Sequence, residues 1–251
     1  TSINAVLARF DHPALDTVAG LFRVAETSLL TFPELDHYAQ RGPAHYWGAL
    51  PAAVAEAPVW PETSGPKVFA YLRTSGVHVD AAMQVLRASG AAVLAYVPDA
   101  TPEWRARYAA PNLRFAAAPV DLNAAARDAD AAVIYASQST TNAFLLAGKP
   151  ILMLPAHLEQ FLTAQRVVEM GAGVLQHPEQ PPSGLAELLA RVLHDPVPRD
   201  NARAFARKYA RFDQAAVLGH LVRRIEAIAN IVNQPSEDAT SHDRPTDRNP
   251  A

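Results

Sequence analysis

From residue 67 onward, short apolar runs alternate with segments whose apolar residues recur at helical spacing. The apolar runs predict strands at 67–72, 92–97, 113–116, 131–135, 151–154 and 173–175. The helical spacing predicts helices at 79–88, 103–108, 122–127, 140–147, 161–170, 184–193, 199–209 and 214–231. Because the strands are apolar throughout rather than at every second residue, we predict an α/β fold in which helices cover both faces of a parallel sheet.

The two ends of the chain are less regular. Residues 2–10 and 15–24 have helical spacing, and 27–32 and 45–50 are predicted as short strands. Residues 57–66 hold three prolines and a glycine, which predicts a linker. From residue 234 the chain is polar, with almost no apolar residues, and we expect a disordered tail.

Composition narrows the class of protein. The chain has 251 residues, of which 49% are hydrophobic and 19% charged, as in a soluble globular protein of one large or two small domains. A net charge of −3 gives no basic excess, so we expect no nucleic-acid partner. No apolar run reaches the roughly 20 residues of a membrane helix, and the start does not resemble a signal peptide. Without Cys, thiolate chemistry and disulfides are excluded, and we expect a cytoplasmic protein.

The stretch Tyr135-Ala136-Ser137-Gln138-Ser139-Thr140-Thr141 joins a predicted strand to a predicted helix. Ligands of open α/β sheets bind at the carboxyl ends of the strands. Small hydroxyl side chains here lie at a helix N-terminus, where unpaired amides and the helix dipole attract an anion such as phosphate. Ser and Thr are also good helix N-caps, so the turn by itself fits either a phosphate site or a plain cap.

An acid–amide pair, Glu159-Gln160, follows the next predicted strand. Both side chains can hydrogen-bond to sugar hydroxyls, which is a strong device for substrate specificity. Acidic residues also favour the first turn of a helix, so a solvated helix start is the alternative. A phosphate turn beside a hydroxyl-binding pair suits a sugar nucleotide.

The residues from Tyr135 to Gly173 resemble the donor domain of nucleotide-sugar glycosyltransferases of the GT-B fold, above all the UDP-glycosyltransferase and macrolide glycosyltransferase group. The resemblance rests on Thr140-Thr141, Leu145, Gly148-Lys149-Pro150, Leu154-Pro155, Glu159-Gln160, Ala164 and Gly171-Ala172-Gly173. Nearer the start, Thr31 to Asp36 and Trp47 to Leu50 resemble the passage that leaves the acceptor domain of these enzymes. The similarity covers most of residues 1 to about 230.

The resemblance implies a Rossmann-like C-terminal domain of a GT-B fold, preceded by a remnant of the acceptor domain. Its domain limits are 1–56 for the end of the acceptor domain, 57–66 for the linker, 67–232 for the donor-binding domain and 233–251 for the tail. The implied enzyme is a hexosyltransferase that uses a UDP- or dTDP-linked donor, with no cofactor and no metal. Because the chain lacks an initial Met, we expect a fragment or processed chain. The acceptor molecule and the catalytic base, which stays unassigned, would then belong to a missing N-terminal domain or a partner subunit.

The resemblance also assigns the donor contacts. The diphosphate would be bound by Thr74, Ser75, Tyr135, Ser137, Gln138, Ser139, Thr140 and Thr141, the sugar by Glu159 and Gln160, and the base by Val120. The chain departs from the family at several of these places. Tyr135 replaces a His, the positions of Ala136, Ser137 and Ser139 are usually Gly, and Ala143 replaces the Glu that grips the ribose.

The roles of Arg73, His157 and the Asp128-Ala129-Asp130 motif can each be interpreted in two ways, as a functional site or as an ordinary structural feature. Arg73 either supplies the positive charge that Tyr135 lacks or is an ordinary exposed Arg. His157 either touches the donor or lies on the surface. Asp128-Ala129-Asp130 looks like a metal-binding DxD motif, but it precedes its strand and so lies at the amino end of the sheet, away from the ligand edge.

Three other functions stay open. The missing His, Glu and Gly residues favour a degenerate, non-catalytic homologue that acts as a partner or regulatory subunit. A donor-binding subunit that joins a separate acceptor subunit is the second possibility. The third, a nucleotide-sugar epimerase, requires further acids and His in the cleft, which the sequence does not indicate.

Overall fold

A computed structural model describes residues 2–24, 26–38, 42, 44–51 and 55–233. The chain divides into two compact units, Leu29–Leu218 and the combination of Thr1–Ser28 with Gly219–Ala251. Of the tail expected at 233–251, all but its first residue lies outside the described residues.

The larger unit is built on one six-stranded sheet. Its strands are β1 Lys67–Tyr71, β2 Ala92–Tyr96, β3 Leu113–Phe115, β4 Ala131–Ile134, β5 Ile151–Met153 and β6 Gly173–Leu175. Every neighbouring pair is parallel, in the order β3-β2-β1-β4-β5-β6, so the predicted parallel sheet is confirmed. The chain order reverses between β1 and β4, which makes the carboxyl ends of these two strands the place where such sheets bind ligands.

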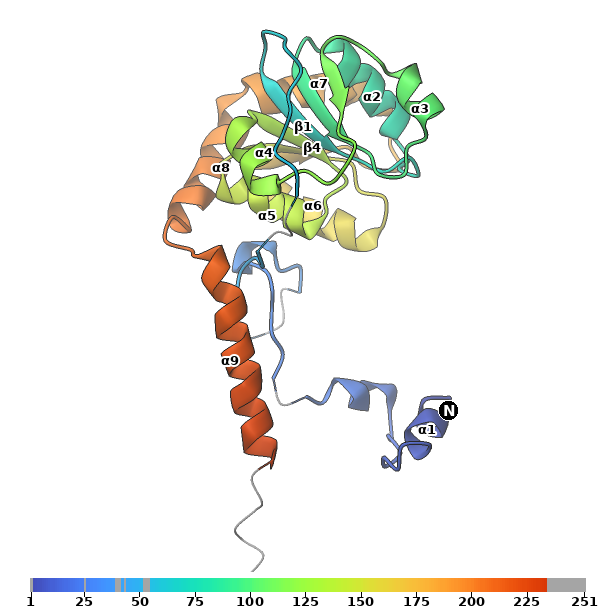
Figure 1. Cartoon of the computed structure of the whole chain (residues 1–251), viewed down its shortest axis with the longest axis vertical. Helices are drawn as coiled ribbons and strands as arrows, with labels where there is room; N and C mark the ends of the chain where they lie inside the picture. The colour runs from blue at the N-terminus through green and yellow to red at the C-terminus, as the bar shows by residue number, and fades with distance from the viewer. Residues whose placement is uncertain (1, 25, 39–41, 43, 52–54, 234–251) are drawn as a thin grey trace, which may run out of the picture. The chain divides into compact units, whose positions relative to one another are not determined.

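Helices cover both faces of this sheet (Figure 1). The helices of this unit are α2 Val79–Ala88, α3 Pro102–Arg107, α4 Leu122–Asp128, α5 Gln138–Leu146, α6 Leu158–Glu169, α7 Leu185–His194 and α8 Pro196–Lys208, with the short 3-10 helices η2 Pro33–Leu35 and η3 Pro182–Gly184. Helix α9 Gln214–Asn233 begins in this unit and continues into the smaller one. One core layer packs α2, α3 and α7 against the sheet, and the other packs α4, α5, α6 and α8. Helices on both faces explain why the strands carry apolar residues at every position.

Successive residues of β1 alternate between the two core layers. Val68 and Ala70 point to the α2 side, whereas Phe69 points to the α5 side and is fully buried. There its ring stacks on Phe144 of α5, with ring centroids 5.7 Å apart. Burying a side chain of this size stabilises the fold by about 1.5–3 kcal/mol, so this contact anchors α5 over the centre of the sheet.

Three helices begin two or three residues earlier than predicted. Helix α5 begins at Gln138 rather than residue 140, α6 at Leu158 rather than residue 161, and α8 at Pro196 rather than residue 199. The first turns of α5 and α6 are mostly polar, and α8 begins with prolines, which are tolerated in the first turn of a helix. Glu159 and Gln160 therefore lie inside the first turn of α6 and not in the loop before it.

The strands predicted at 27–32 and 45–50 are wrong. The only pairing within the described part of these segments is a single parallel bridge between Leu29 and Tyr46. Gly48, with φ at +77°, interrupts the extended backbone of the second segment. Two backbone hydrogen bonds, from Trp47 to Leu29 at 2.8 Å and from Gly48 to Thr31 at 3.1 Å, join the segments, but two short strands without a third are unstable as a sheet.

The smaller unit contains α1 Ser2–Ala8, the 3-10 helix η1 Val18–Phe22 and the end of α9. Here the helix predicted at 15–24 is reduced to η1, which buries none of its residues and so has no packing to lengthen it. Asn4 exchanges two hydrogen bonds of 3.0 Å with the backbone of Leu15. Arg224 of α9 forms an ion pair with Glu26 at 2.5 Å.

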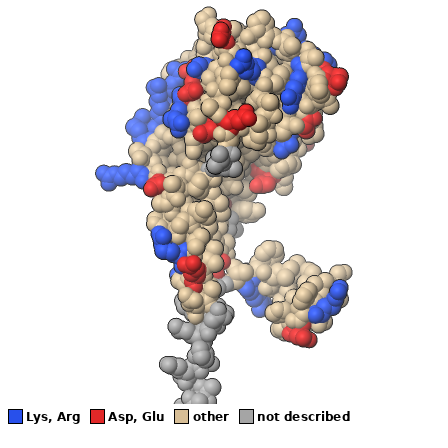
Figure 2. Space-filling model, in the orientation of Figure 1, with Lys and Arg blue, Asp and Glu red and all other residues tan. Residues whose placement is uncertain are grey.

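Charge is mixed on the surface. On the face that Figure 2 shows, basic and acidic side chains are interspersed over the described residues, without a large patch of one sign. None of the helices in the described part of the chain is long and apolar enough to cross a bilayer.

Candidate functional site

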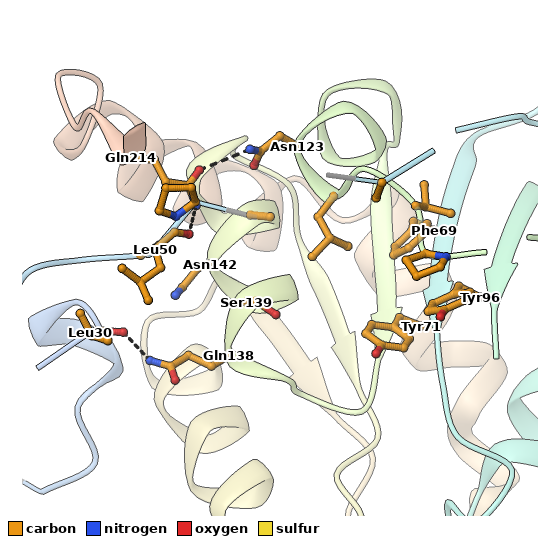
Figure 3. A pocket seen from close by; sticks show the side chains of 17 residues that line it. Leu30, Leu50, Phe69, Tyr71, Tyr96, Asn123, Gln138, Ser139, Asn142 and Gln214 are labelled. Atoms are coloured by element: carbon orange, nitrogen blue, oxygen red, sulfur yellow. Dashed lines mark hydrogen bonds between the residues drawn. The ribbon is translucent and has the colours of Figure 1, made fainter. Parts of the chain in front are cut away.

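A cavity of about 480 Å³ lies at the carboxyl edge of the sheet, beside the reversal of strand order between β1 and β4. Its walls come from β1 and β2, the loop before α4, the first turns of α5, and, in the N-terminal segment, Leu30, Ala49, Leu50, Pro51 and Ala55. Figure 3 shows Ser139 and Asn142 of α5 on one side and the rings of Tyr71 and Tyr96 on the other. The cavity combines aromatic walls with a few polar groups, as small-molecule sites usually do.

The turn that leads from β4 into α5 has an unusual backbone. Ala136 adopts φ at +64°, in the left-handed region that favours glycine. The resemblance to GT-B glycosyltransferases places a Gly at this position, where the chain has Ala. Tyr135, just before it, is tied to the end of β1 by a hydrogen bond from its amide to the carbonyl of Tyr71 at 3.2 Å.

The first amides of α5 have no hydrogen-bond partner within the helix, and Gln138 and Ser139 are exposed. Ser137 occupies the N-cap, but its side chain makes no capping hydrogen bond to them. Its hydroxyl donates instead to Oγ1 of Thr140 at 2.9 Å. The amides of Gln138, Ser139 and Thr140 have no partner inside the helix, because the first intrahelical acceptor, the carbonyl of Ser137, bonds to Thr141. Unpaired amides at a helix start bind anions readily.

Thr140 and Thr141 point away from solvent. Both side chains are fully buried. The hydroxyl of Thr141 donates to the carbonyl of Ser137 at 2.8 Å, and that of Thr140 accepts from Ser137. In this conformation Thr140 and Thr141 shape the turn, while Gln138 and Ser139 are its exposed residues.

Asn142 is a site residue that the sequence did not single out. It lines the cavity one helical turn after Ser139, and its carbonyl oxygen Oδ1 is buried without a hydrogen-bond partner among the described residues. A buried polar atom without a partner costs about 1–3 kcal/mol. The i, i+3 spacing from Ser139 is the sequence signal that would have found it.

Three tyrosines and Arg73 gather at the ends of β1 and β4. The ring of Tyr71 packs against Tyr96 at 5.2 Å and Tyr135 at 4.9 Å between centroids. Burial, and then a hydrogen bond with Tyr135, raise the pKa of Tyr71 to about 12, so this hydroxyl stays protonated. Burial lowers the pKa of Arg73, but the hydrogen bond with Tyr135 and the charges of Tyr71, Tyr135 and Asp99 together raise it by more. Arg73 thus contacts Tyr135 while its side chain is exposed, which fits both of its interpretations.

The loop after β1 already has an acidic partner. Both the amide and the hydroxyl of Thr74 donate to the carboxylate of Asp99, at 3.0 and 2.7 Å. Ser75 is exposed beside it. Asp99 follows β2. Its carboxylate accepts from the amide of Thr74, a residue that the resemblance assigns to the diphosphate.

Val120 lies where the base is predicted to bind. It is buried, lines the cavity and pairs through a parallel bridge with Glu56. That bridge holds the start of the linker with hydrogen bonds from Glu56 to Pro119 at 3.0 Å and from Asp121 to Glu56 at 2.8 Å. Val120 therefore offers a fixed apolar surface to a ligand.

The predicted sugar residues separate into two roles. Gln160 accepts a hydrogen bond from the amide of Ala156 at 2.9 Å and so closes the loop before α6. Glu159 is exposed and lines a second, smaller cavity of about 110 Å³. His157 is the exposed N-cap of α6.

The two acids of the DxD-like motif are used by the fold. Asp130 accepts from the amide of Lys67 at 2.8 Å, and Asp128 accepts from the indole of Trp60 at 3.2 Å. They fasten the linker and β1 at the amino edge of the sheet. Within the described residues, no group of three or more His, Cys, Asp and Glu side chains is arranged to hold a metal ion.

The Gly-Lys-Pro stretch ends α5. Gly148 adopts φ at +69°, and the amides of Gly148 and Lys149 bond back to the carbonyls of Leu145 and Phe144 at 3.0 and 2.9 Å. This is the usual way in which a glycine terminates a helix. The stretch therefore positions β5 after α5 and does not contact the cavity.

Comparison with known proteins identifies a family to which this chain is similar. Residues 84–221 match the model of a protein family described as "Erythromycin biosynthesis protein CIII-like, C-terminal domain". No curated protein sequence matches the chain.

Several solved structures share the fold. The glycosyltransferase VinC in complex with dTDP is 22% identical with a TM-score of 0.71, and the match covers 90% of this chain and 58% of that one. The spinosyn rhamnosyltransferase SpnG is 21% identical with a TM-score of 0.63, covering 78% and 54%. The glycosyltransferase SnogD from Streptomyces nogalater is 17% identical with a TM-score of 0.60, covering 79% and 57%. The chain thus spans between 54% and 58% of these three structures. The predicted fold, a Rossmann-like C-terminal domain of GT-B glycosyltransferases, is confirmed.

Proposed function

Because the chain belongs to the family of erythromycin biosynthesis protein CIII-like C-terminal domains, we propose that its larger cavity binds the nucleoside diphosphate part of a sugar donor. The observation that carries the proposal is the position of this cavity, at the reversal of strand order and against the open first turn of α5. An anion at that turn meets unpaired amides and the positive end of the helix dipole.

The diphosphate would lie against the amides of Gln138 and Ser139, with Arg73 as the nearby cation. The orphan carbonyl oxygen of Asn142 would accept a hydrogen bond from a ribose hydroxyl, and so take the part of the missing Glu at the position of Ala143. The base would lie against the fixed apolar surface of Val120. Since VinC was solved with dTDP, dTDP and UDP are the first nucleotides to test.

The reaction that we propose is transfer of a hexose to an acceptor hydroxyl. The acceptor oxygen forms a bond to C1 of the sugar while the bond from C1 to the diphosphate oxygen breaks, and the acceptor proton passes to a base. The amides at the start of α5 would stabilise the charge that develops on the departing diphosphate. The acceptor and the base would be supplied by an N-terminal domain or a partner subunit, since the chain spans 58% of VinC.

The domain limits 1–56, 57–66, 67–232 and 233–251 are part of the same proposal, as is a location in the cytoplasm. Residues 1–56 would be the end of an acceptor domain, and the linker would join it to the donor-binding domain.

A non-catalytic homologue that acts as a partner subunit is the second candidate. It is favoured by the way in which Thr74, Thr140 and Thr141 use their hydroxyls inside the protein and by the acid that Asp99 adds to the phosphate loop. A chain of this kind would keep the fold without affinity for a nucleotide.

Calorimetric titration of the whole chain with dTDP and UDP separates the two candidates. We expect saturable binding of at least one nucleotide, and we expect Ser139→Trp to abolish it by filling the cavity. The matched control is Ala190→Trp, which fills a cavity of about 460 Å³ between α2 and α7 and should leave binding unchanged. A chain indifferent to both nucleotides at millimolar concentration would favour the non-catalytic homologue.

A further inference from the structure

Three of the 22 basic residues in the chain are lysines, namely Lys67, Lys149 and Lys208. An arginine keeps its charge at every physiological pH, whereas a lysine that loses its proton becomes a nucleophile. Because the chain has no Cys, these three amines are the side chains that an activated acyl group converts to a stable amide. The surroundings of each amine decide which of the three gives up its proton most easily.

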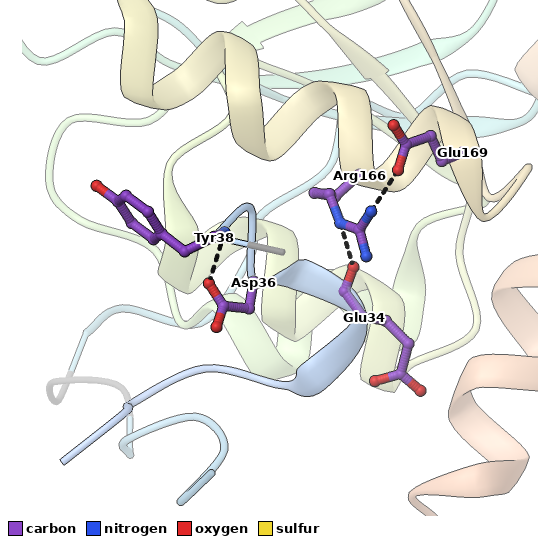
Figure 4. Close-up of polar contacts among 5 residues, drawn as sticks. All are labelled: Glu34, Asp36, Tyr38, Arg166 and Glu169. Atoms are coloured by element: carbon purple, nitrogen blue, oxygen red, sulfur yellow. Dashed lines mark hydrogen bonds and ion pairs between the residues drawn. The ribbon is translucent and has the colours of Figure 1, made fainter. Parts of the chain in front are cut away.

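Lys208 has a carboxylate partner. It forms an ion pair with Glu34. Figure 4 shows the carboxylate of Glu34 pointing away from Arg166, whose side chain donates instead to the backbone carbonyl of Glu34 at 3.1 Å. The carboxylate is therefore left for Lys208, and an ion pair of this kind favours the protonated amine.

Lys67 is paired with an aromatic ring. Its Nζ lies over Trp60, 5.5 Å from the ring centroid. The negative face of the ring attracts a cation, so this contact also favours the protonated amine.

Lys149 has neither kind of partner. It lies in the turn between α5 and β5, half-buried, at the amino edge of the sheet and therefore opposite the edge that holds the larger cavity. Its Nζ donates to the backbone carbonyl of Arg127, at the end of α4, at 3.3 Å. Within the described residues it forms no ion pair with a carboxylate.

Helix α8 places two cations beside this turn. Arg203 packs over Gly148, with its Cγ 3.2 Å from the place where a Cβ of that glycine would stand. Arg199, one helical turn earlier, donates to the carbonyl of Leu193 at 2.8 Å. The charges of both arginines act on Lys149.

Two acids face Lys149 as well, but both are bonded elsewhere. Asp130 accepts from the amide of Lys67, and Asp128 accepts from the indole of Trp60. Burial, together with the charges of the two arginines, lowers the pKa of Lys149 by more than the two acids raise it. A half-buried amine among cations thus has a larger neutral fraction than an ordinary lysine, and the same cations attract an anionic reagent.

We propose that Lys149 is a modification site, acylated by an anionic activated acyl donor of the acyl phosphate class. The neutral amine attacks the acyl carbon, and a C–N bond forms while the bond from that carbon to the phosphate oxygen breaks. The phosphate leaves with the electron pair, and the proton that the nitrogen loses passes to solvent. Arg199 and Arg203 would hold the phosphate group of the donor.

The product also suits this position. An acylated lysine carries no charge, so the repulsion by Arg199 and Arg203 ends, while its remaining N–H can still donate to the carbonyl of Arg127. The site lies at the amino edge of the sheet, so the proposal is independent of whether a nucleotide binds at the other edge.

The test follows acetylation of the whole chain by acetyl phosphate at pH 8, with the rate at each of the three lysines measured by peptide mass spectrometry. We expect Lys149 to react at least about threefold faster than Lys67 or Lys208, because more of it is neutral. Arg203→Gln should slow the reaction at Lys149 by about two- to fivefold, since one of its two cations is lost. Arg207→Gln, an exposed substitution on the same helix, is the matched control and should leave the rate unchanged.

A neutral reagent tests the unaltered chain without any variant. With the N-hydroxysuccinimide ester of acetic acid, Lys149 should still react fastest, but by a smaller margin, because the arginines do not attract an uncharged donor. If Lys149 reacts with acetyl phosphate no faster than Lys208, or if Arg203→Gln and Arg207→Gln slow it equally, the proposal is overturned. A margin as large with the neutral ester as with acetyl phosphate would overturn the choice of an anionic donor.

Discussion

The carboxylate of Asp99 accepts hydrogen bonds from both the amide and the hydroxyl of Thr74, at 3.0 and 2.7 Å. The pair joins the loop after β2 to the loop after β1, at the edge where we propose that a diphosphate binds. This carboxylate should weaken the binding of a diphosphate in two ways: its negative charge repels the anion, and the amide of Thr74 already donates to it.

Asp99→Asn should therefore raise the affinity for dTDP or UDP. We expect an increase of about two- to fivefold at low salt, because the charge is exposed and partly screened, and a smaller increase at high salt. Calorimetry at two salt concentrations measures it. Asp200→Asn, on the exposed surface of α8, is the control that should have no effect. An unchanged or lower affinity for Asp99→Asn would place the diphosphate elsewhere.

Ala136→Gly tests the left-handed turn before α5. A non-glycine residue at φ of +64° is strained by about 1–2 kcal/mol, so the substitution should be neutral or stabilise the protein by up to about 1 kcal/mol, although it deletes a buried methyl group. Ala132→Gly in β4 removes the same group without relieving strain and should destabilise by about 1 kcal/mol. Urea unfolding compares the two, and equal losses of stability would show that the turn is not strained.

Asn142→Leu should change stability and binding in opposite directions. Replacing a buried acceptor that has no partner with an apolar side chain of similar size stabilises the free protein, by about 1 kcal/mol. The same change removes the proposed ribose contact and should weaken nucleotide binding about tenfold. Urea unfolding and calorimetry on one preparation give both values. A variant that loses stability and keeps its affinity would remove Asn142 from the site.

Glu34 makes the attachment of the N-terminal segment sensitive to acid. Burial alone raises its pKa, but the hydrogen bonds from Lys208 and Tyr209 and the charge of Lys208 lower it by more, so the folded-state pKa lies below 4.5. Stability from this group is present above the unfolded-state pKa and is lost as the pH falls through the folded-state value.

Glu34→Gln should therefore destabilise the protein at pH 7, by about 1–3 kcal/mol, and should make its stability less dependent on pH between about 5 and 3. Urea unfolding at several pH values measures both effects. Glu169→Gln, which alters an exposed ion pair with Arg166, should cost less than about 1 kcal/mol. If the two variants lost the same amount, Glu34 would not hold the segment.

The central fold could be predicted from sequence because its signal is local. Buried parallel strands are continuous apolar runs, and the six strands were predicted to within one residue at each end. The segments at 27–32 and 45–50 have the same local pattern but no neighbouring strands, and neighbours are not visible in a local pattern. The helix starts at Gln138 and Leu158 were missed because a polar first turn resembles a loop.

The candidate site was only partly predictable. The turn before α5 was located from its place between a strand and a helix, and Gln138 and Ser139 do face the cavity. Which hydroxyls of that turn are buried depends on the face that α5 packs against the sheet. The sequence of α5 has no clear apolar face, so that face could not be predicted. Leu30 of the N-terminal segment reaches the cavity only through contacts between residues more than 100 positions apart, such as its hydrogen bond from Gln138.

The most direct test of the proposed site is a titration of the isotopically labelled chain with dTDP and UDP, followed through its backbone amide NMR signals. We predict saturable shifts for the amides of Gln138, Ser139 and Thr140, the groups that would bind the diphosphate, together with Val120 beside the base. Signals from the groove between α2 and α7 should stay in place. Amides at the start of α5 that do not move at millimolar nucleotide, or shifts centred on another part of the molecule, would contradict the account.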